Sequence, residues 1–311
     1  MSMLSRVADN LYWFGRYLQR AENTARLINV HANLLLDLPR NLTVGWLPLL
    51  EIAGADGLFK TTGMEPTEDN VVRFLMVDER NPGAIFSSLC FARDIARVSR
   101  DCMPREAWER LNDLFLFVQD RGERSVSRAR RQDFLQGVIN GAMLLVGVLT
   151  SNMSRDVGFQ FLRIGTNLEQ ADMTTRILDV RSSRLFVADA TLTPFDNIQW
   201  MSVLKSLTAY QMYRRHVKAR VNGTNVLRFL LQNRQFPRSV SYCLSMVGSA
   251  LPFLPPSRKV ERAIERTKAL VMDANIENLL EQPDGLALFM DEIQIGLGLV
   301  DDAVVESYFR T

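Results

Sequence analysis

Cysteine and histidine are scarce in this chain of 311 residues, which contains three Cys and two His. Cys90, Cys102 and Cys243 form no even, closely spaced framework, so we expect no disulfide scaffold and predict a cytoplasmic location. His31 and His216 have no second His or Cys at ligand spacing, and Glu-x-x-His does not occur in the sequence. The sequence therefore predicts no metal site.

Long hydrophobic runs and the common catalytic motifs are also missing. The longest apolar run, AMLLVGVL at residues 142–149, is far shorter than the roughly 18–20 residues that a membrane span needs. The N-terminal MSMLSRVADN carries Arg6 and Asp9 where a signal peptide would need an unbroken apolar run. The chain has no G-x-G-x-x-G, no Walker-type loop and no G-x-S-x-G, so we expect no cofactor, no catalytic residue and no membrane contact.

Lysine is the third scarce residue. Five of the 37 basic residues are Lys and the other 32 are Arg, while the net charge is only +2. A charge this small gives no whole-chain reason to bind nucleic acid or an anionic membrane. Arg forms forked pairs with carboxylate or phosphate, although codon usage in a GC-rich genome also explains the preference.

What the chain has in abundance is helical periodicity, and two stretches share it. Apolar residues of the first stretch recur in steps of three and four, which places them on one helical stripe: Val7, Leu11, Phe14, Leu18, Ala21, Ala25 and Ile28. The second stretch repeats the same offsets: Val157, Phe161, Ile164, Leu168, Ala171, Thr175 and Leu178. Gly15 is matched by Gly165, and we expect two long helices that bury the same face.

The similarity extends along the chain. Trp46 matches Trp200, the Arg-Phe-Leu that begins at Arg73 matches the one at Arg228, and Pro82 matches Pro237. We therefore predict an all-α protein built by internal duplication, with tandem units at residues 1–152 and 153–311 packed as one body. Each unit is expected to hold about six helices. Those of the first unit fall near residues 3–36, 43–53, 67–77, 82–100, 105–127 and 131–151. Those of the second fall near residues 153–184, 196–220, 224–232, 237–251, 257–281 and 285–309. Residues 54–66 read as an irregular stretch, where the second unit has a longer helix instead.

A polar motif lies at the edge of both apolar stripes. Gln19, Glu22 and Arg26 occupy it in the first helix, and the second helix has a matching set: Glu169, Asp172 and Arg176. Glu22–Arg26 and Asp172–Arg176 are acid-before-base pairs four residues apart, the favoured order for a helical ion pair. Three roles stay open for the motif: a buried network that fixes a helix crossing, a ligand or partner site shared by the two halves, or a catalytic carboxylate. We predict that the two motif helices cross close together, because Ala21 and Ala171 permit near approach.

Three arginines form a second candidate site. Arg93, Arg97 and Arg100 lie four and three residues apart, which predicts one cationic helical face able to bind an acidic peptide or a nucleotide. Glu106 and Glu109 on the following helix could satisfy the same charges. Two further basic runs, at residues 124–131 and 213–220, are interpreted as solvated helix ends.

Three quoted stretches carry a family resemblance over essentially the whole chain. MLSRVADNLYWFGRYLQRAENTARL, DERNPGAIFSSLCFARDIARVSRD and LEQADMTTRILDV resemble the bacterial alpha-E domain family, which is all-helical and named for a Glu-Arg motif. Members of that family occur beside, or fused to, circularly permuted ATP-grasp ligase domains and transglutaminase-like proteases. The resemblance implies a role in a peptide-ligating or amide-forming system, without implying a defined reaction.

The sequence departs from the family pattern at the motif. The LERAE type of motif appears as LQRAE, with Gln19 before Arg20, and the second copy reads LEQAD, with Glu169 before Gln170. Each copy therefore lacks one member of the Glu-Arg dipeptide, and Arg20 could complement Glu169 if the two halves meet face to face.

We interpret the chain as a non-catalytic accessory or binding subunit for an ATP-grasp type ligase, with a transglutaminase-like protein as a further partner. One alternative is an enzyme of peptide or amide chemistry that uses Glu22, Glu169 and Asp172 as acid or base groups. The other alternative is a purely structural scaffold. An enzyme should show Glu22 and Glu169 in an open cleft, a scaffold should bury and pair them, and a binding subunit should expose an apolar patch bordered by Arg.

Overall fold

The protein is described from a computed structural model that places residues 5–37, 45–185, 196–282 and 284–310, with the backbone alone at residues 36–37, 180–185 and 196. Within these ranges the chain forms fifteen α-helices and three short 3-10 helices, and no strand. The prediction of an all-α protein is confirmed. Residues 3–4 and 43–44, where we expected two helices to begin, lie outside the described ranges.

The chain divides into two compact units, Met1–Thr166 and Asn167–Thr311. The division falls inside one helix, so packing separates the chain at a different point from the 1–152 and 153–311 boundaries expected from the repeat. The boundaries at 1–152 and 153–311 stay a prediction about which two segments arose by duplication.

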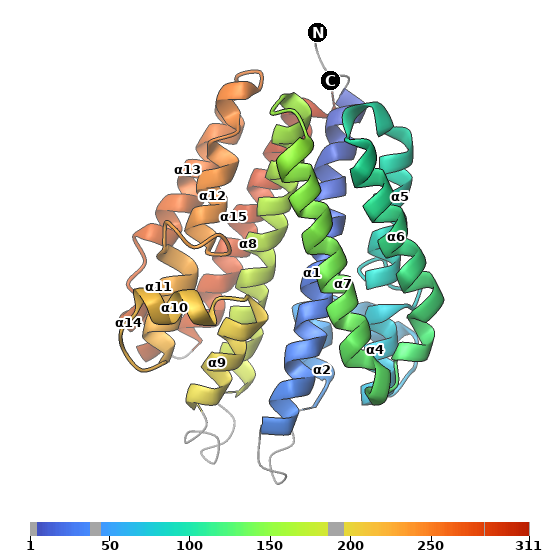
Figure 1. The fold of residues 1–311 in the computed structure, drawn as a ribbon. Coiled ribbons are helices and arrows are strands. Elements are labelled where there is room, and N and C mark those ends of the chain that lie inside the picture. Colours follow the sequence, from blue (N-terminus) through green and yellow to red (C-terminus); the bar gives the residue numbers. More distant parts are fainter. Residues whose placement is uncertain (1–4, 38–44, 186–195, 283, 311) are drawn as a thin grey trace. The chain divides into compact units, whose positions relative to one another are not determined.

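The first unit is a bundle around one long helix. Helix α1 packs against α5 and α7, and α6 packs against the outer sides of α5 and α7 (Figure 1). The first part of α8 also belongs to this unit. Its seven other helices are α1 (Ser5–Asp37), α2 (Leu47–Ile52), α3 (Asp56–Thr61), α4 (Glu68–Met76), α5 (Ile85–Val98), α6 (Arg105–Arg121) and α7 (Arg128–Asn152).

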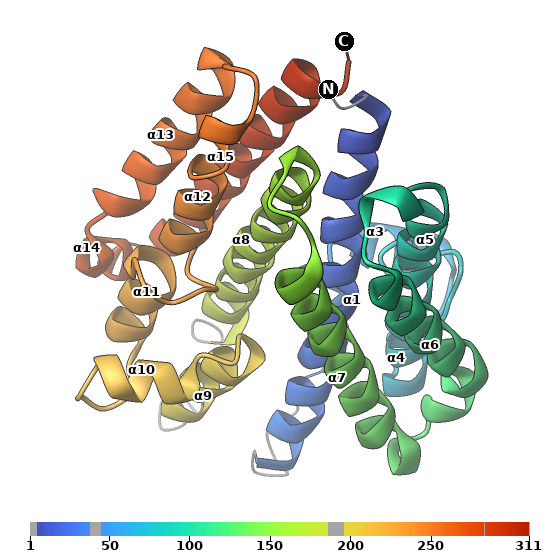
Figure 2. The ribbon, with the colours of Figure 1, turned by 45° about the horizontal axis from the view of Figure 1, so that its top comes forward.

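The second unit contains the rest of α8 (Val157–Leu185) and seven further helices. Helix α13 lies between α12 and α15, and Figures 1 and 2 both show α13 and α15 side by side. The seven helices are α9 (Asp196–Ser206), α10 (Tyr210–His216), α11 (Gly223–Gln232), α12 (Val240–Gly248), α13 (Arg258–Met272), α14 (Ile276–Glu281) and α15 (Gly285–Tyr308).

The apolar stripe of α1 is the buried face of the helix, as its periodicity predicts. Leu11, Phe14 and Ile28 are each at most 1% exposed. Every third or fourth residue of an α-helix points the same way, so this spacing directs all of these side chains into the core of the first unit.

Two glycines bring α1 and the first part of α8 into close contact. A Cβ atom at Gly15 would press on the carbonyl oxygen of Leu162, and one at Gly165 would press on that of Tyr12. Both obstacles are backbone atoms, which cannot move aside as a flexible side chain does. We had expected near approach at Ala21 and Ala171, but this contact of the first unit lies at the glycines one to two turns earlier in each helix.

The expectation of an irregular stretch at residues 54–66 is wrong, and so is the single long helix at 196–220. Gly54 adopts a positive φ of 63° after α2, and helix α3 follows it. Thr208 adopts a positive φ of 51° after α9, and helix α10 follows it. A left-handed residue reverses the course of the backbone and ends a helix, so each unit has a helix–turn–helix at this point.

Two other expected helices are shorter than predicted. Helix α13 ends at Met272, and α14 starts anew after Asn275, whose side chain accepts a hydrogen bond from the Asn278 N–H. Such an N-cap satisfies a donor that the new helix leaves free. Helix α6 ends at Arg121, and Glu123–Ser125 forms a 3-10 turn. The helices beyond the six expected are α3 in the first unit and α10 and α14 in the second.

Contacts at matching positions recur in the two units. Arg73 of α4 pairs with Glu123, and Arg228 of α11 pairs with Glu277. The ring of Phe59 meets that of Phe74 edge-on at 5.1 Å. Tyr213 meets Phe229 in the same way at 5.6 Å. In both units this ring pair attaches the short helix after the left-handed residue to the helix that follows it in the chain.

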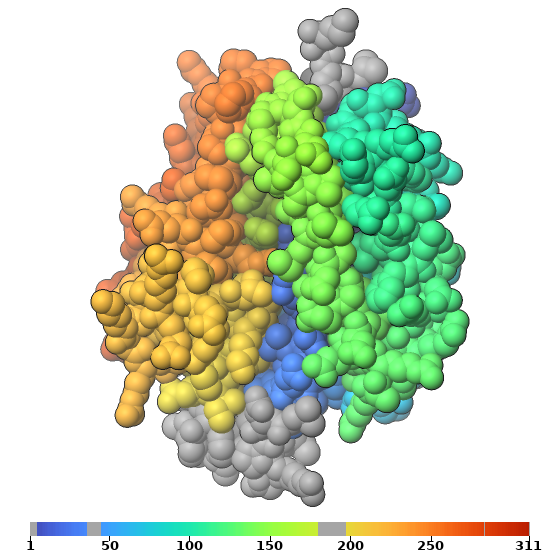
Figure 3. Space-filling view, in the orientation of Figure 1, coloured from blue at the N-terminus to red at the C-terminus, as the bar shows by residue number. Residues whose placement is uncertain are grey.

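Helix α7 combines a buried and an exposed apolar side. Its buried side packs against α1 and α6, while Met143 and Leu144 are more than half exposed. Much of α7 is visible on the face drawn in Figure 3. Among the described helices, α7 is the one long and apolar enough to cross a membrane, a test that core helices of helical bundles also pass.

Candidate functional site

The first copy of the polar motif is buried and closely paired. The Nε of Arg26 donates a hydrogen bond to Glu22 Oε1 at 2.8 Å. The amide of Gln19 donates to Glu22 Oε2 at 3.3 Å and to Asn23 Oδ1 at 2.9 Å. The side chain of Glu22 is 5% exposed and that of Arg26 is 12% exposed. Arg26 also reaches α7, where its Nη2 lies 3.1 Å from Met143 Sδ.

The second copy of the motif makes the same kind of ion pair, but its side chains are more exposed to solvent. The Nε of Arg176 donates to Asp172 Oδ2 at 2.8 Å, but the two side chains are 34% and 23% exposed. Glu169, which precedes this pair by one turn, is buried. The two copies therefore share a bond and differ in solvation, so removal of the acid should be costly in the first copy and nearly neutral in the second.

The chemistry open to the motif is limited by this pairing. Both carboxylate oxygens of Glu22 accept a hydrogen bond from a neighbour on the same helix. An acid–base catalyst must instead reach the proton that it transfers, with an oxygen directed at the substrate. No group of three or more His, Cys, Asp and Glu side chains suited to a metal ion occurs in the ranges that the structure covers.

The residues that depart from the family pattern occupy different surroundings. The guanidinium of Arg20 lies over the ring of Tyr17, with 5.7 Å between Cζ and the ring centroid. Gln170 Oε1 lies 4.0 Å from the Sγ of Cys243, a fully buried thiol on α12. Burial raises the pKa of Cys243 to about 12, so the thiol stays neutral beside the amide. Complementation of Arg20 by Glu169 concerns both units and stays a prediction.

The three arginines of the second candidate site do not share one helical face. Helix α5 ends at Val98, and Arg100 begins a 3-10 turn. Arg93 donates to Asn112 Oδ1 at 2.9 Å, and its guanidinium lies over Phe115 of α6. Arg97 is exposed and pairs with Asp94 at 3.4 Å.

Helix α6 supplies aromatic rings to these cations in place of the acidic residues suggested by the sequence. The guanidinium of Arg100 lies over the ring of Trp108 at 4.3 Å, a stabilising cation–π arrangement. Glu109 pairs with Arg105 of its own helix. Arg97 and Arg100 are the two exposed arginines of the three, and Arg97 also pairs with Asp94 of its own helix.

A charged cluster that we did not predict lies between α4 and α7. Arg128 Nε and Arg131 Nη1 both donate to Glu68 Oε1, at 2.8 and 2.6 Å. Arg131 also donates through Nη2 to the carbonyl of Val126 at 2.6 Å, and its side chain is only 4% exposed. The neighbouring Arg128 guanidinium, with Arg131 behind it, holds the pKa of Glu68 below its usual value.

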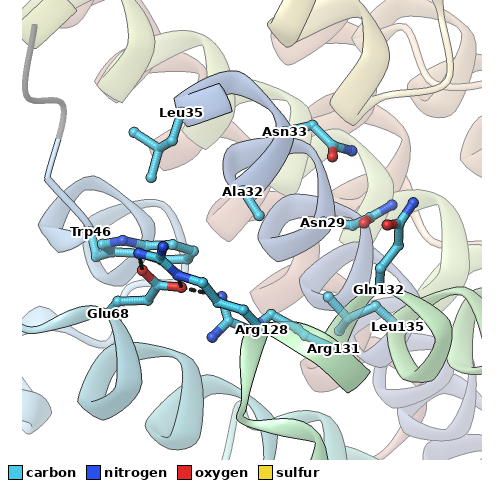
Figure 4. Close-up of a pocket in the computed structure, with 10 residues that line it drawn as sticks. All are labelled: Asn29, Ala32, Asn33, Leu35, Trp46, Glu68, Arg128, Arg131, Gln132 and Leu135. Atoms are coloured by element: carbon cyan, nitrogen blue, oxygen red, sulfur yellow. Dashed lines mark hydrogen bonds and ion pairs between the residues drawn. The ribbon is translucent and has the colours of Figure 1, made fainter. Parts of the chain in front are cut away.

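The cluster closes one end of a cavity of about 230 Å³ in the first unit (Figure 4). Its walls come from α1, Trp46, the start of α4 and α7. The residues that line it are Asn29, Ala32, Asn33, Leu35, Trp46, Glu68, Arg128, Arg131, Gln132 and Leu135. We had interpreted the run at 124–131 as a solvated helix end, which is wrong for Arg131. The spacing of Arg128 and Arg131, three residues apart, was the available signal.

A groove between α13 and α15 is the second feature that the sequence reasoning missed. Its volume is about 540 Å³, and Ile295 and Leu299 expose 65% and 47% of their surface along it. Arg262 and Arg266 form one wall, and within the described part of the chain neither makes an ion pair. This is an apolar surface bordered by two arginines without an ion-pair partner among the described residues, and Glu292 of α15 also lines it.

Comparison with known proteins places the chain in a family. Residues 3–309 match the family described as a predicted alpha-helical domain with a conserved ER motif, which is named alpha-E. The chain belongs to the alpha-E family. The match covers both units, so the two together correspond to one alpha-E domain.

The relatives of this alpha-E domain that are found among curated proteins are themselves uncharacterised. A protein of Mycobacterium bovis is 25% identical over 314 residues, which cover 94% of the domain and 35% of the relative. A protein of Mycobacterium tuberculosis shows the same identity and coverage. The chain thus spans about a third of the length of these relatives. No solved structure gives a significant match.

Proposed function

We propose that this alpha-E domain is a non-catalytic binding domain that serves an ATP-grasp type peptide or amide ligase, with a transglutaminase-like protein as a further partner. Two findings support the non-catalytic part. Glu22 is buried, and both of its oxygens are occupied. An enzyme that used this carboxylate would need it in an open cleft.

The observation that carries the proposal is the groove between α13 and α15. Exposed Ile295 and Leu299 offer an apolar floor, and Arg262 and Arg266 offer two cations four residues apart without ion-pair partners among the described residues. An amphipathic helix that carries acidic residues beside its apolar face complements both features. We therefore propose such a helix of the ligase as the occupant of the groove.

The scaffold alternative has one observation in its favour, which concerns the motif only. The Gln19–Glu22–Arg26 network is paired along α1 and largely buried, and Arg26 also reaches α7, as a clamp that fixes helix packing would. We propose that the motif has this structural role while the groove binds the partner. The Arg93, Arg97 and Arg100 region, where Arg97 is accessible, is a secondary candidate for an acidic peptide or a nucleotide.

We also propose that the chain arose by duplication. The ion pairs Arg73–Glu123 and Arg228–Glu277 join matching positions and support this origin. So do the ring pairs and the left-handed residues Gly54 and Thr208.

A cytoplasmic location is part of the proposal, and it is supported by three cysteines that are free thiols.

Charge reversal of the groove tests the proposed function. The variant with Arg262→Glu and Arg266→Glu should lose association with the ATP-grasp ligase of the native host, because acidic side chains would face acidic side chains. Co-purification from that host, with identification and quantification of the ligase, measures the effect. Both arginines are exposed, so the thermal midpoint should change little.

Two single variants serve as comparisons. Arg258→Glu reverses a charge on an exposed residue of the same helix that does not line the groove, and it should leave association intact. Arg97→Glu tests the secondary candidate region. If association survives the double reversal, the groove is not the docking site. If no ATP-grasp ligase co-purifies with the unchanged chain, the proposed function itself is contradicted.

A further inference from the structure

Three carboxamide side chains meet around the cavity of the first unit. Asn29 and Asn33 project from α1, and Gln132 projects from α7; Figure 4 shows the amides of Asn29 and Gln132 next to each other, with Asn33 beyond them. Within the described residues none of the three has a hydrogen-bond partner. By contrast, Gln136, one turn further along α7, donates to Asn140 at 2.8 Å. Asn29 is half-buried, while Asn33 and Gln132 are exposed to solvent, so the wall and rim of the cavity present three amides without a protein partner among the described residues.

The charged groups at the other end of the cavity are occupied by one another. Glu68 accepts from both Arg128 and Arg131, and Arg131 directs its remaining Nε and Nη2 donors at the carbonyl of Val126. A carboxylate or phosphate ligand would have to compete with Glu68 for the guanidinium N–H donors that already bind it. Arg128 is itself 81% exposed at this end, whereas the hydrogen-bonding groups at the opposite end of the cavity are the three uncharged amides.

The aromatic side chain in the cavity has no free face for a sugar ring. Trp46 is only 8% exposed, with the guanidinium of Arg131 at 5.4 Å from its ring centroid and the ring of His31 at 4.9 Å. Sugar sites commonly depend on an open aromatic face, which Trp46 does not offer. An amide suits the cavity better, because its N–H and C=O can pair with the C=O and N–H of a carboxamide.

We propose that this cavity binds an uncharged primary amide, of the kind that a glutamine or asparagine side chain of a peptide presents. Asn29, Asn33 and Gln132 would pair with the amide, and Ala32, Leu35 and Leu135 would contact its methylene groups. The volume of about 230 Å³ is below the roughly 300–1,000 Å³ of sites for drug-sized ligands, so it suits one side chain with its adjoining backbone. The site is separate from the groove of the second unit and does not depend on the ligase function.

Titration of the full chain with blocked amino acids tests the proposal. The probe is N-acetyl-glutamine methylamide, compared with the glutamate and methionine equivalents and with glucose. Side-chain amide signals of Asn29, Asn33 and Gln132 in ¹H–¹⁵N spectra report binding. The glutamine probe should shift all three signals and bind at least about fivefold more tightly than the others, the effect expected of one net hydrogen bond.

Variants locate the binding. Gln132→Met and Asn33→Leu keep size and remove the amide, and each should weaken the glutamine probe by about fivefold or more. Gln136→Met is the matched control on α7, and it should bind as the unchanged chain does. Equal binding of the glutamate probe or of glucose would overturn the assignment to an amide. Absence of any shift, or equal loss in Gln136→Met, would overturn the site.

Discussion

At the scale of single residues, Arg131 shows that tertiary packing, and not sequence pattern, decides whether a charged side chain is solvated or buried and paired. Its side chain is 4% exposed and is surrounded by Glu68, the Val126 carbonyl and the ring of Trp46. A buried guanidinium is tolerated only when its donors are satisfied, and Glu68 satisfies one of them while also binding the exposed Arg128. Glu68 is therefore the residue that keeps this end of the cavity folded.

Replacement of Glu68 by Gln should destabilise the protein in a pH-dependent way. At neutral pH the loss should be about 3 kcal/mol, because a buried guanidinium loses its counter-charge. The Arg128 and Arg131 guanidiniums lower the pKa of Glu68 in the folded state, so its contribution is complete above the unfolded value of 4.5. That contribution disappears as the pH falls through the lower, folded pKa.

Urea unfolding of both proteins, from neutral pH to well below 4.5, measures this prediction. The difference between the unchanged chain and Glu68→Gln should shrink as the solution becomes acidic. Glu65→Gln, at an exposed position three residues earlier, should show little difference at any pH. A Glu68→Gln loss that stays constant with pH would show that packing, and not charge, is responsible.

At the scale of elements, the contact between α1 and the first part of α8 depends on the absence of two side chains. Gly15 faces the carbonyl of Leu162, and Gly165 faces that of Tyr12. Glycine normally weakens a helix interior by roughly 0.5–1 kcal/mol relative to alanine. The chain accepts this cost at both positions because only glycine allows the two backbones to come so close.

Alanine at these positions should therefore destabilise the protein despite its better helix propensity. Gly15→Ala and Gly165→Ala should each lower the free energy of unfolding by about 1–3 kcal/mol, the usual range for overpacking. Gly147→Ala in α7 is the matched control, since a Cβ there meets nothing within 4 Å. It should stabilise by up to about 1 kcal/mol. Denaturant unfolding ranks the three, and stabilisation by all of them would rule out a tight contact.

The short helices α3 and α10 illustrate another limit at this scale. Each is six or seven residues long, too short to be stable alone. Packing of Phe59 on Phe74, and of Tyr213 on Phe229, holds them in place. The sequence predicted no helix at α3 and one continuous helix across α9 and α10, because the ring that stabilises each short helix lies in a different element of the same unit.

At the scale of the whole molecule, the remaining question is whether the two copies of the motif act together. Glu22→Gln should cost about 3–5 kcal/mol, because its pair is nearly dry. Asp172→Asn should cost less than about 1 kcal/mol, because its pair is partly solvated. If the copies form one polar centre, as the repeated sequence predicts, the double variant should deviate from additivity by more than about 0.5 kcal/mol.

Urea unfolding of the two single variants and the double variant measures this coupling. Additive losses would contradict a shared centre and would leave each copy as an independent clamp within its own helix. Equal losses in the two single variants would contradict the difference in solvation between the copies.

The amino-acid sequence by itself determined the all-helical class, the family and the buried stripe of α1. These follow from local spacing, since residues three and four apart share a helical face whatever surrounds the helix. The pairing of Glu22 with Arg26 follows for the same reason. The helix ends at Ser206 and Met272 were harder to predict from the sequence, because they depend on the left-handed Thr208 and on a new cap at Asn275.

Only the tertiary structure decided which polar groups are available for binding. Arg93 and Arg100 lie against the rings of α6, although the sequence predicted an anion-binding face there, and Arg131 is buried beside Glu68, although the sequence predicted a solvated helix end. Asn29, Asn33 and Gln132 looked unremarkable until α1 and α7 brought them to one cavity. The physical reason is that burial and pairing depend on residues distant in the chain, which helical spacing does not specify.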